Sequence, residues 1–180
     1  WLRTRLDQGL PVVPISLNVS RVDILTCDVA EHMGALATQY NLPPELMRIE
    51  ITETAYTGES EAVDRLTAEL HNRGFSTYMD DFGTGQSTLA MLKSVNVDVI
   101  KLDRTFVPAG KADERSTQIV SSMLGMAQSL HLPVVVEGVE TEAQAQLLRQ
   151  MGARYAQGFL YYCPMPAADF EELLDSKVAD

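Results

Sequence analysis

Stretches with the residue pattern of a β-strand alternate with stretches of helical pattern along the chain, and this alternation limits the possible folds. Runs rich in β-branched and apolar residues predict strands at residues 12–19, 48–52, 75–81, 97–103, 133–137 and 154–160. Helices are expected at residues 23–40, 59–73, 88–94, 113–130, 141–151 and 167–174. Strands separated by helices pair in parallel through right-handed crossovers, so the sequence predicts an α/β fold.

Two architectures accommodate these parallel strands, namely an open doubly wound sheet and part of a (β/α)₈ barrel. A barrel needs about eight strand–helix units, so its first part would precede residue 1. The 180 residues suffice for one domain with a sizeable core. The first residue is Trp1, which leads us to expect a piece of a longer protein.

The composition excludes several classes of function. The net charge of −11 opposes binding to the phosphate backbone of DNA or RNA polymers. A small phosphate ligand still fits, because a bound metal ion can supply the positive field. We find no signal peptide and no run of about 18 apolar residues, so we expect no membrane segment in this chain. We expect a cytoplasmic domain, whether or not the full-length protein is tethered to a membrane.

The sequence DDFGTG at residues 80–85 ends one predicted strand with two adjacent carboxylates, Asp80 and Asp81. Neighbouring carboxylates repel each other, whereas hard Mg²⁺ or Mn²⁺ ions prefer carboxylate oxygens, and one carboxylate can bridge two ions. Taken alone, the motif also fits a capped turn before a helix. The other strands decide between these two interpretations.

Side chains alternate along a strand, and one face of the predicted strands turns polar near the carboxyl ends. The polar positions are Asn18, Glu50, Asp80, Lys101, Asp103, Glu137 and Gln157. With Asp81 this face has five carboxylates, but the nearby cations are Lys101 and Arg48. Burying unpaired charges costs several kcal/mol each, so salt bridges alone do not balance the cluster and one or two divalent ions are expected. Active sites of parallel α/β proteins lie at these strand ends.

The order of these motifs resembles the EAL-domain family of cyclic di-GMP phosphodiesterases. The matching strings are NVS at 18–20, EITE at 50–53, DDFGTG at 80–85, KLDRTFV at 101–107, EGVET at 137–141 and QGF at 157–159. The resemblance implies an α/β fold of the TIM-like (β/α)₈ barrel type, here missing its first strand or strands and their helices. Residues 1–180 would be the C-terminal three-quarters of a single EAL-type barrel domain.

The resemblance implies hydrolysis of cyclic di-GMP to linear pGpG with one or two Mg²⁺ or Mn²⁺ ions. Asn18, Glu50 and Asp80 are expected to hold one ion. Asp80 is expected to bridge to a second ion that Asp81 also holds. Between the ions, a water would lose a proton and attack phosphorus in line.

The remaining motif residues receive supporting roles from the same resemblance. Glu137 is expected to be the general base or a further carboxylate beside the metal, and Lys101 to orient the water or neutralise phosphoryl charge. Asp103 and Gln157 would complete the pocket. Glu53 would brace the loop at residues 80–85 from behind the metal ligands. Glu140 is a further candidate, although it also fits an acidic first turn of the following helix.

The chain departs from the family pattern at three points. The Glu-Ala-Leu motif and the strand that carries it are absent, Gln86 stands where an aromatic residue is usual, and Cys163 stands where a lysine is frequent. We therefore expect residues 1–180 alone to be inactive. The expected partners are cyclic di-GMP, a second copy in a homodimer, and an upstream GGDEF or sensor domain. The alternatives are a catalytically inactive EAL-like receptor or protein-interaction module, or an unrelated metal-dependent barrel enzyme.

Overall fold

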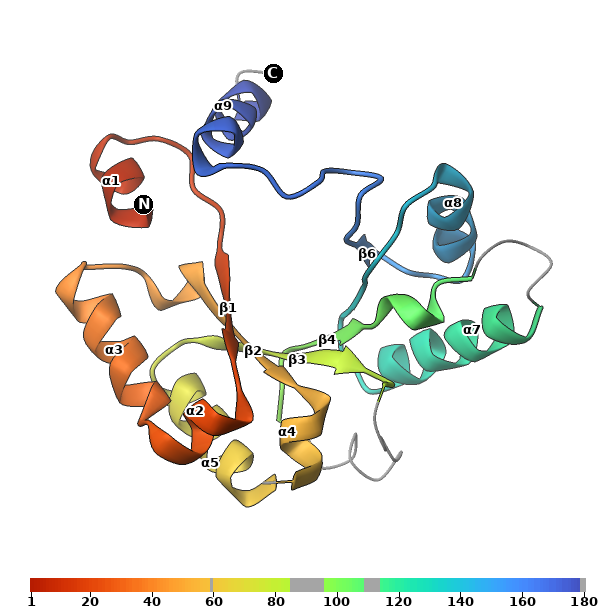
Figure 1. The fold of residues 1–180 in the computed structure, drawn as a ribbon, viewed down its shortest axis with the longest axis horizontal. Coiled ribbons are helices and arrows are strands. Elements are labelled where there is room, and N and C mark those ends of the chain that lie inside the picture. The colour runs from red at the N-terminus through yellow and green to blue at the C-terminus, as the bar shows by residue number, and fades with distance from the viewer. Residues whose placement is uncertain (59, 85–95, 109–113, 179–180) are drawn as a thin grey trace.

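The computed structural model describes residues 1–58, 60–84, 96–108 and 114–178, and these contain one parallel sheet (Figure 1). Its strands are β1 (Ile15–Val19), β2 (Met47–Thr52), β3 (Ser76–Phe82), β4 (Val99–Leu102), β5 (Val134–Val136) and β6 (Tyr155–Ala156). Every pairing is parallel, and the strands follow one another in chain order. A doubly wound sheet reverses its strand order, whereas a barrel does not, so the sheet is an arc of a barrel.

Helices surround the strands in Figure 1. They are α1 (Leu2–Asp7), α2 (Arg21–Thr26), α3 (Val29–Gln39), α4 (Glu53–Gly58), α5 (Ser60–Asn72), α7 (Glu114–Ser129), α8 (Glu142–Gln150) and α9 (Ala167–Val178), with 3₁₀ turns η1 (Pro44–Leu46) and η2 (Arg104–Phe106). The helix expected at residues 88–94 lies outside the described residues. None of the described helices combines the length and the hydropathy that a membrane-spanning segment needs.

The single helix expected at residues 23–40 is wrong, because the structure has two helices there. Cys27 is extended, with φ −129° and ψ 149°, and ends α2. The Asp28 side chain then accepts a hydrogen bond from the backbone N–H of Glu31 and caps α3. An aspartate cap therefore starts a second helix without any glycine or proline in between. The sequence prediction also lacked α1 and α4.

The core lies between the outer face of the sheet and the helices. Its most buried strand residues are Ile49, Ile51, Met79, Ile100, Leu102 and Val136. The prediction of a buried first strand is wrong for Ile15 and Leu17, which are 36% and 38% exposed. Among the described strands β1 pairs with β2 alone, so its other edge is open.

Contacts between α1 and α9 hold the two ends of the chain together. The Trp1 indole N–H donates a hydrogen bond to Glu171 Oε1 at 2.7 Å, and the Trp1 ring lies 6.0 Å from the Phe170 ring. Arg5 is buried and pairs with Asp175. The chain after β6 reaches α9 across the open side of the sheet (Figure 1). Helix contacts thus join the regions before β1 and after β6.

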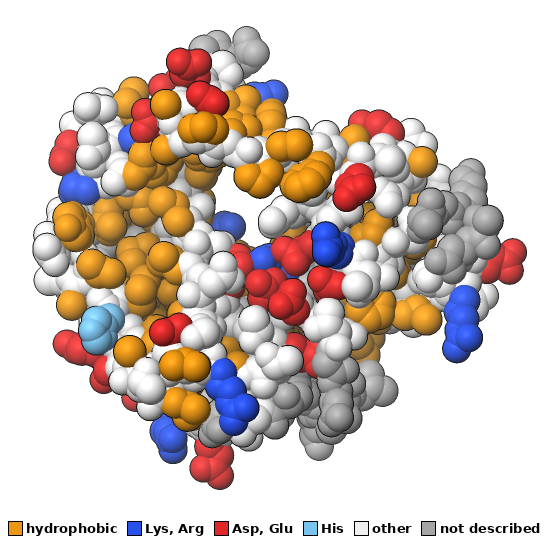
Figure 2. Space-filling view, viewed as in Figure 1, with side chains coloured by type: hydrophobic (Ala, Val, Ile, Leu, Met, Phe, Trp, Pro, Cys, Tyr) orange, Lys and Arg blue, Asp and Glu red, His pale blue; other side chains and the backbone are white. Residues whose placement is uncertain are grey.

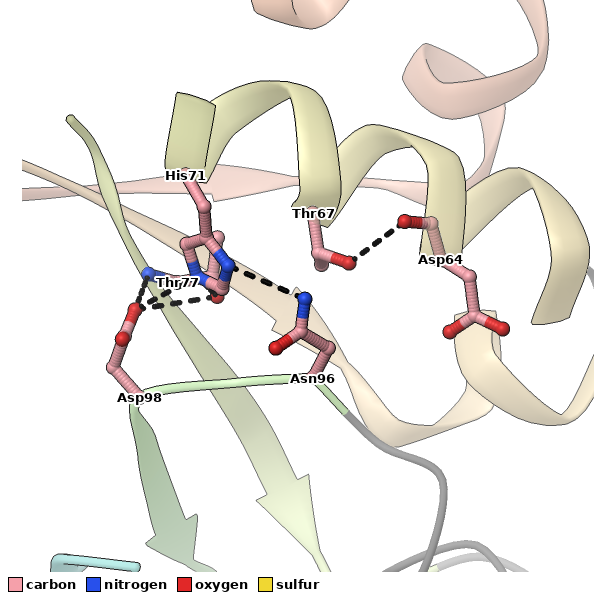
Figure 3. A network of polar contacts seen from close by, with 6 residues as sticks. All are labelled: Asp64, Thr67, His71, Thr77, Asn96 and Asp98. Carbon is pink, nitrogen blue, oxygen red and sulfur yellow. Dashed lines mark hydrogen bonds and ion pairs between the residues drawn. The ribbon is translucent and has the colours of Figure 1, made fainter. Parts of the chain in front are cut away.

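A polar network connects the amino ends of β3 and β4, at which these two strands begin (Figure 3). Asp98 Oδ2 accepts a hydrogen bond from the backbone N–H of Thr77 at 2.7 Å. His71 Nε2, from α5, lies 3.0 Å from the same oxygen and 2.9 Å from Thr77 Oγ1. Asn96 Nδ2 lies 3.3 Å from His71 Nδ1. The network thus joins α5 to the beginnings of two neighbouring strands.

Candidate metal centre

Charged side chains gather on the inner face of the sheet, where strands β2 to β5 end. Glu50 in β2 and Lys101 in β4 are only 7% and 6% exposed. Asp80 in β3 and Glu137, directly after β5, are partly buried. Figure 2 shows acidic and basic side chains together near the centre of the molecule, beside a hollow. The structure thus brings together predicted site residues from neighbouring strands.

Lys101 lies at the centre of this cluster. Its Nζ is 2.7 Å from Glu50 Oε2, 2.9 Å from Glu137 Oε1 and 3.0 Å from Asp80 Oδ1. Burial disfavours the charged ammonium, but the contacts with these carboxylates outweigh burial and raise the pKa of Lys101. Lys101 therefore stays protonated, and one positive charge faces three carboxylates. This arrangement agrees with the expectation from the sequence that the cluster has more carboxylates than cations.

A β-bulge in β3 lets Asp80 and Asp81 both reach the cluster. The register of β3 against β4 shifts between residues 79 and 82, so Asp80 and Asp81 together oppose the single residue Lys101. Asp81 has a left-handed backbone conformation with φ 56°. Regular alternation would send two adjacent side chains to opposite faces, so sequence pattern alone did not explain the pair.

Asp80, Asp81 and Glu137 each present a carboxylate oxygen, and these oxygens lie within 4.8 Å of one another. Burial raises the pKa of Asp81, and the charge of Asp80 adds to the effect. Burial also raises the pKa of Glu137, although Lys101 favours its charged form. The carboxylates are therefore difficult to ionise together unless a further cation is present.

This set of donors fits a hard divalent cation. Asp80 Oδ1 is buried and, among the described residues, accepts no hydrogen bond of good geometry, although Lys101 Nζ lies at ion-pair distance. Carboxylate oxygens are the ligands that Mg²⁺ and Mn²⁺ prefer. Asp80, Asp81 and Glu137 are therefore well placed to hold a metal ion.

Two further predicted residues lie beside this cluster. Asn18 is opposite Glu50 in the register of β1 and β2, and it is exposed. Glu53 is fully buried at the start of α4, and its Oε2 accepts a hydrogen bond from the backbone N–H of Gly83 at 2.7 Å. Because Gly83 follows the bulge closely, this carboxylate holds the turn after Asp81.

The last three predicted residues have different surroundings. Asp103 Oδ1 accepts a hydrogen bond from the Thr105 N–H at 2.9 Å and caps η2. Burial opposes its charge, but the hydrogen bonds from Thr105 outweigh burial and lower the pKa of Asp103. Glu140 is exposed, and its backbone N–H donates to Gln144 Oε1 at the start of α8. Gln157 lines a cavity of about 400 Å³ that also reaches the buried lysine and glutamate of the cluster.

A parallel sheet in sequential order, with a carboxylate cluster at the carboxyl ends of its strands, defines a barrel-type α/β domain with a candidate metal centre. The chain belongs to the EAL domain family, whose model matches residues 2–164. The resemblance seen in the sequence is thereby confirmed. The decisive signal was the order of several short motifs rather than any one of them.

Solved structures confirm the predicted fold class. The EAL domain of Mycobacterium smegmatis DcpA superposes with a TM-score of 0.88 at 33% identity, covering 97% of this chain and 79% of that chain. The PaMucR phosphodiesterase in complex with c-di-GMP superposes with a TM-score of 0.84 at 31% identity, covering 94% of this chain and 73% of that one. The described sheet is therefore part of the TIM-like barrel of this family.

Curated relatives share the sequence over most of this chain. Cyclic di-GMP phosphodiesterase RocR of Pseudomonas aeruginosa is 37% identical over 168 residues, which cover 93% of this chain and 43% of RocR. Cyclic di-GMP phosphodiesterase NbdA of the same organism is 34% identical, over 89% of this chain and 20% of NbdA. The chain thus spans less than half the length of these relatives.

Proposed function

We propose that residues 1–180 are the C-terminal three-quarters of a single EAL-type domain that hydrolyses cyclic di-GMP to linear pGpG. RocR and NbdA are named as cyclic di-GMP phosphodiesterases, and PaMucR phosphodiesterase has been solved with c-di-GMP. The coverage of 79% of the DcpA EAL chain supports the assigned share of the domain. The observation that carries the proposal is the group of Asp80, Asp81 and Glu137 oxygens within 4.8 Å of one another.

The proposed metal ligands come from three neighbouring strands. Asn18, Glu50 and Asp80 would hold one Mg²⁺ or Mn²⁺ ion, and Asp80 and Asp81 would hold a second. Such ions, when bound, stabilise phosphoryl charge and lower the pKa of water. Lys101 holds the acidic oxygens of β2, β3 and the end of β5 together, with contacts between 2.7 and 3.0 Å.

Glu137 is the proposed general base. It accepts a proton from water while the water oxygen forms a bond to phosphorus and the bond from phosphorus to the 3′ oxygen breaks. The leaving 3′ oxygen takes up a proton from solvent water, which yields the 5′-phosphate and free 3′-hydroxyl of pGpG, and Glu137 later returns its proton to solvent. Burial raises the pKa of Glu137, which makes its carboxylate a stronger base. Lys101, 2.9 Å from Glu137, supplies positive charge for the phosphoryl oxygens.

The natural full-length protein that contains these residues provides the test. We expect it to convert cyclic di-GMP to pGpG in the presence of Mg²⁺ or Mn²⁺, and we expect a chelator to stop the reaction. Asp80→Asn removes the shared ligand and should abolish turnover, whereas Asp7→Asn in α1 should not. A folded, metal-loaded wild-type protein that leaves cyclic di-GMP intact would contradict the proposal. Calorimetric binding of cyclic di-GMP by that protein with Ca²⁺ would then favour a receptor.

The same proposal includes the rest of the full-length protein, a second copy of the domain and the cellular compartment. Residues 1–180 alone would be inactive and bind metal weakly, because Asn18 lies on the open edge strand β1. An upstream GGDEF or sensor domain fits the relative MucR, named a bifunctional diguanylate cyclase/cyclic di-GMP phosphodiesterase, of which this chain covers 25%. Exposed Ile15 and Leu17 make homodimer formation through this edge a further expectation. Cyclic di-GMP hydrolysis would take place in the cytoplasm.

A further inference from the structure

The 3₁₀ turn η2 lies between two glycines that follow acidic residues of the candidate metal centre. Gly83 comes two residues after Asp81, and Gly138 comes directly after Glu137. Both glycines have left-handed backbones, with φ +96° at Gly83 and +70° at Gly138. The turn begins two residues after β4, which lies between β3, the strand of Asp81, and β5, which Glu137 directly follows.

The ring of Phe106, in η2, packs on the bare Cα of Gly83. A Cβ at position 83 would lie 2.4 Å from Phe106 Cε2 and 2.6 Å from Cζ, which is closer than real Cβ atoms approach their neighbours. Met123 Cε, from α7, would lie 3.4 Å from the same point. The N–H of this glycine donates to Glu53 Oε2 at 2.7 Å. Gly83 is thus held by a ring from one element and a carboxylate from another.

The first residue of η2 makes the matching contact with the other glycine. A Cβ at Gly138 would lie 2.2 Å from Arg104 Cβ and 3.2 Å from Arg104 Cα. The hydrogen bond that the Thr105 N–H donates to Asp103 Oδ1 fixes the conformation of the turn between these two contacts. The turn therefore sets the distance between the backbone after Asp81 and the backbone after Glu137.

Asp81 has a left-handed backbone, with φ 56°. This conformation is less favourable for aspartate than for glycine, so contacts of the surrounding residues help to keep it. The Glu53 hydrogen bond and the Phe106 ring hold the following turn, together with hydrogen bonds from the Thr84 N–H and hydroxyl to Asp81 O at 3.2 and 2.9 Å. Loss of the ring would leave room beside Gly83 for this backbone to relax, which would let the Asp81 carboxylate turn away from the cluster.

We propose that Phe106 is a positioning residue of the metal centre, which holds the Asp81 carboxylate beside Asp80 and Glu137 by packing on Gly83. This inference rests on the proposed binding of a metal ion by Asp80 and Asp81. Mere packing of Phe106 in the core would affect the stability of the fold alone. Positioning predicts a loss of metal affinity in protein that remains folded.

Manganese binding to the full-length protein tests this role, with free Mn²⁺ measured by electron paramagnetic resonance. Phe106→Leu keeps an apolar side chain but removes the ring, and we expect roughly 10- to 100-fold weaker Mn²⁺ binding, as for other residues that support metal ligands. The control is Val120→Ala, which removes buried atoms from α7. We expect this control to lose stability and keep its Mn²⁺ affinity.

Hydrogen exchange of the metal-free protein supplies a second readout. Phe106→Leu should speed exchange of the Gly83 amide, while the Glu137 amide, which donates to Leu102 O at 2.9 Å, stays protected. Wild-type affinity together with wild-type Gly83 exchange in folded Phe106→Leu would overturn the inference, as would equal losses in Val120→Ala. If Phe106→Leu does not fold, Phe106→Met, whose longer and more flexible apolar chain can adapt to the space left by the ring, takes its place with the same expectations.

The two proposals fail in different ways. A wild-type protein that binds Mn²⁺ but does not hydrolyse cyclic di-GMP would contradict the proposed activity and leave the positioning role of Phe106 intact. A wild-type protein without Mn²⁺ affinity would contradict the metal centre and this inference together. The exchange rate at Gly83 then reports whether the ring still fixes the turn.

Discussion

Lys101 Nζ lies 2.7 Å from Glu50 Oε2, and the two side chains are only 8% and 9% exposed. Neither charge is fully hydrated, so each depends on the other for its stability. The same ammonium also contacts Asp80 and Glu137. Removal of this cation therefore affects three acids from separate strands.

Lys101→Met should lower the free energy of unfolding by about 3–5 kcal/mol in the absence of metal, because it leaves buried carboxylates unpaired. Mg²⁺ should restore part of the loss by supplying the missing positive charge. Urea denaturation with and without Mg²⁺ measures both effects. Lys177→Met, at an exposed position of α9, is the control. A metal-free Lys101→Met protein as stable as wild type would contradict this prediction.

The raised pKa of Glu137 predicts that stability without metal depends on pH. Burial is the main cause that raises this pKa above the ordinary value of 4.5. Above 4.5 the folded protein then binds more protons than the unfolded chain, so the free energy of unfolding falls as the pH rises through the folded-state pKa. Glu137→Gln should flatten this slope in denaturation curves recorded from pH 4 upward, and the exposed control Glu142→Gln should not. An unchanged slope in Glu137→Gln would count against this assignment.

Asp98→Asn should destabilise the fold through the network in Figure 3. The carboxylate accepts a charge-assisted bond from the Thr77 N–H, and its loss should lower the free energy of unfolding by about 1.5–3 kcal/mol. Asp64→Asn is the control, because the Asp64 backbone oxygen, rather than its side chain, accepts the bond from Thr67. Thermal unfolding of the two variants compares them directly, and equal melting temperatures would contradict the prediction.

The open edge of β1 should exchange its amide hydrogens rapidly. Ile15 and Leu17 are more than a third exposed, and β1 has β2 as its one neighbour among the described strands. In a dilute monomer of residues 1–180, we expect β1 to be much less protected than β3, which is paired on both sides. Strong protection of β1 in that monomer would contradict the prediction of an open edge.

Strand positions were predictable because burial against helices demands apolar outer residues such as Ile49 and Ile51. Helix boundaries were less predictable. The break between α2 and α3 depends on Asp28 as a cap, in a stretch with no glycine or proline. Helix α1 is stabilised by Arg5, which contacts Asp175 at the other end of the chain, and local sequence does not reveal such a contact.

Among the predicted site residues, Glu50, Asp80 and Glu137 could be grouped from sequence, because alternation and parallel pairing place them at one edge. Their joint contact with Lys101 depends on the register of the sheet and appears only in the structure. The same holds for the contact between Phe106 and Gly83. Tertiary packing decides both contacts, and no short motif encodes them.

The two adjacent acids Asp80 and Asp81 reach the same cluster because β3 has one residue more than β4 at the bulge. A substitution at either position changes the group presented there but keeps the two-against-one arrangement. Deletion of one residue from this part of β3 would restore a regular ladder and turn one neighbouring side chain to the helical side. A change of strand length would therefore separate the two side chains even where both aspartates are kept, and it would leave the barrel in place.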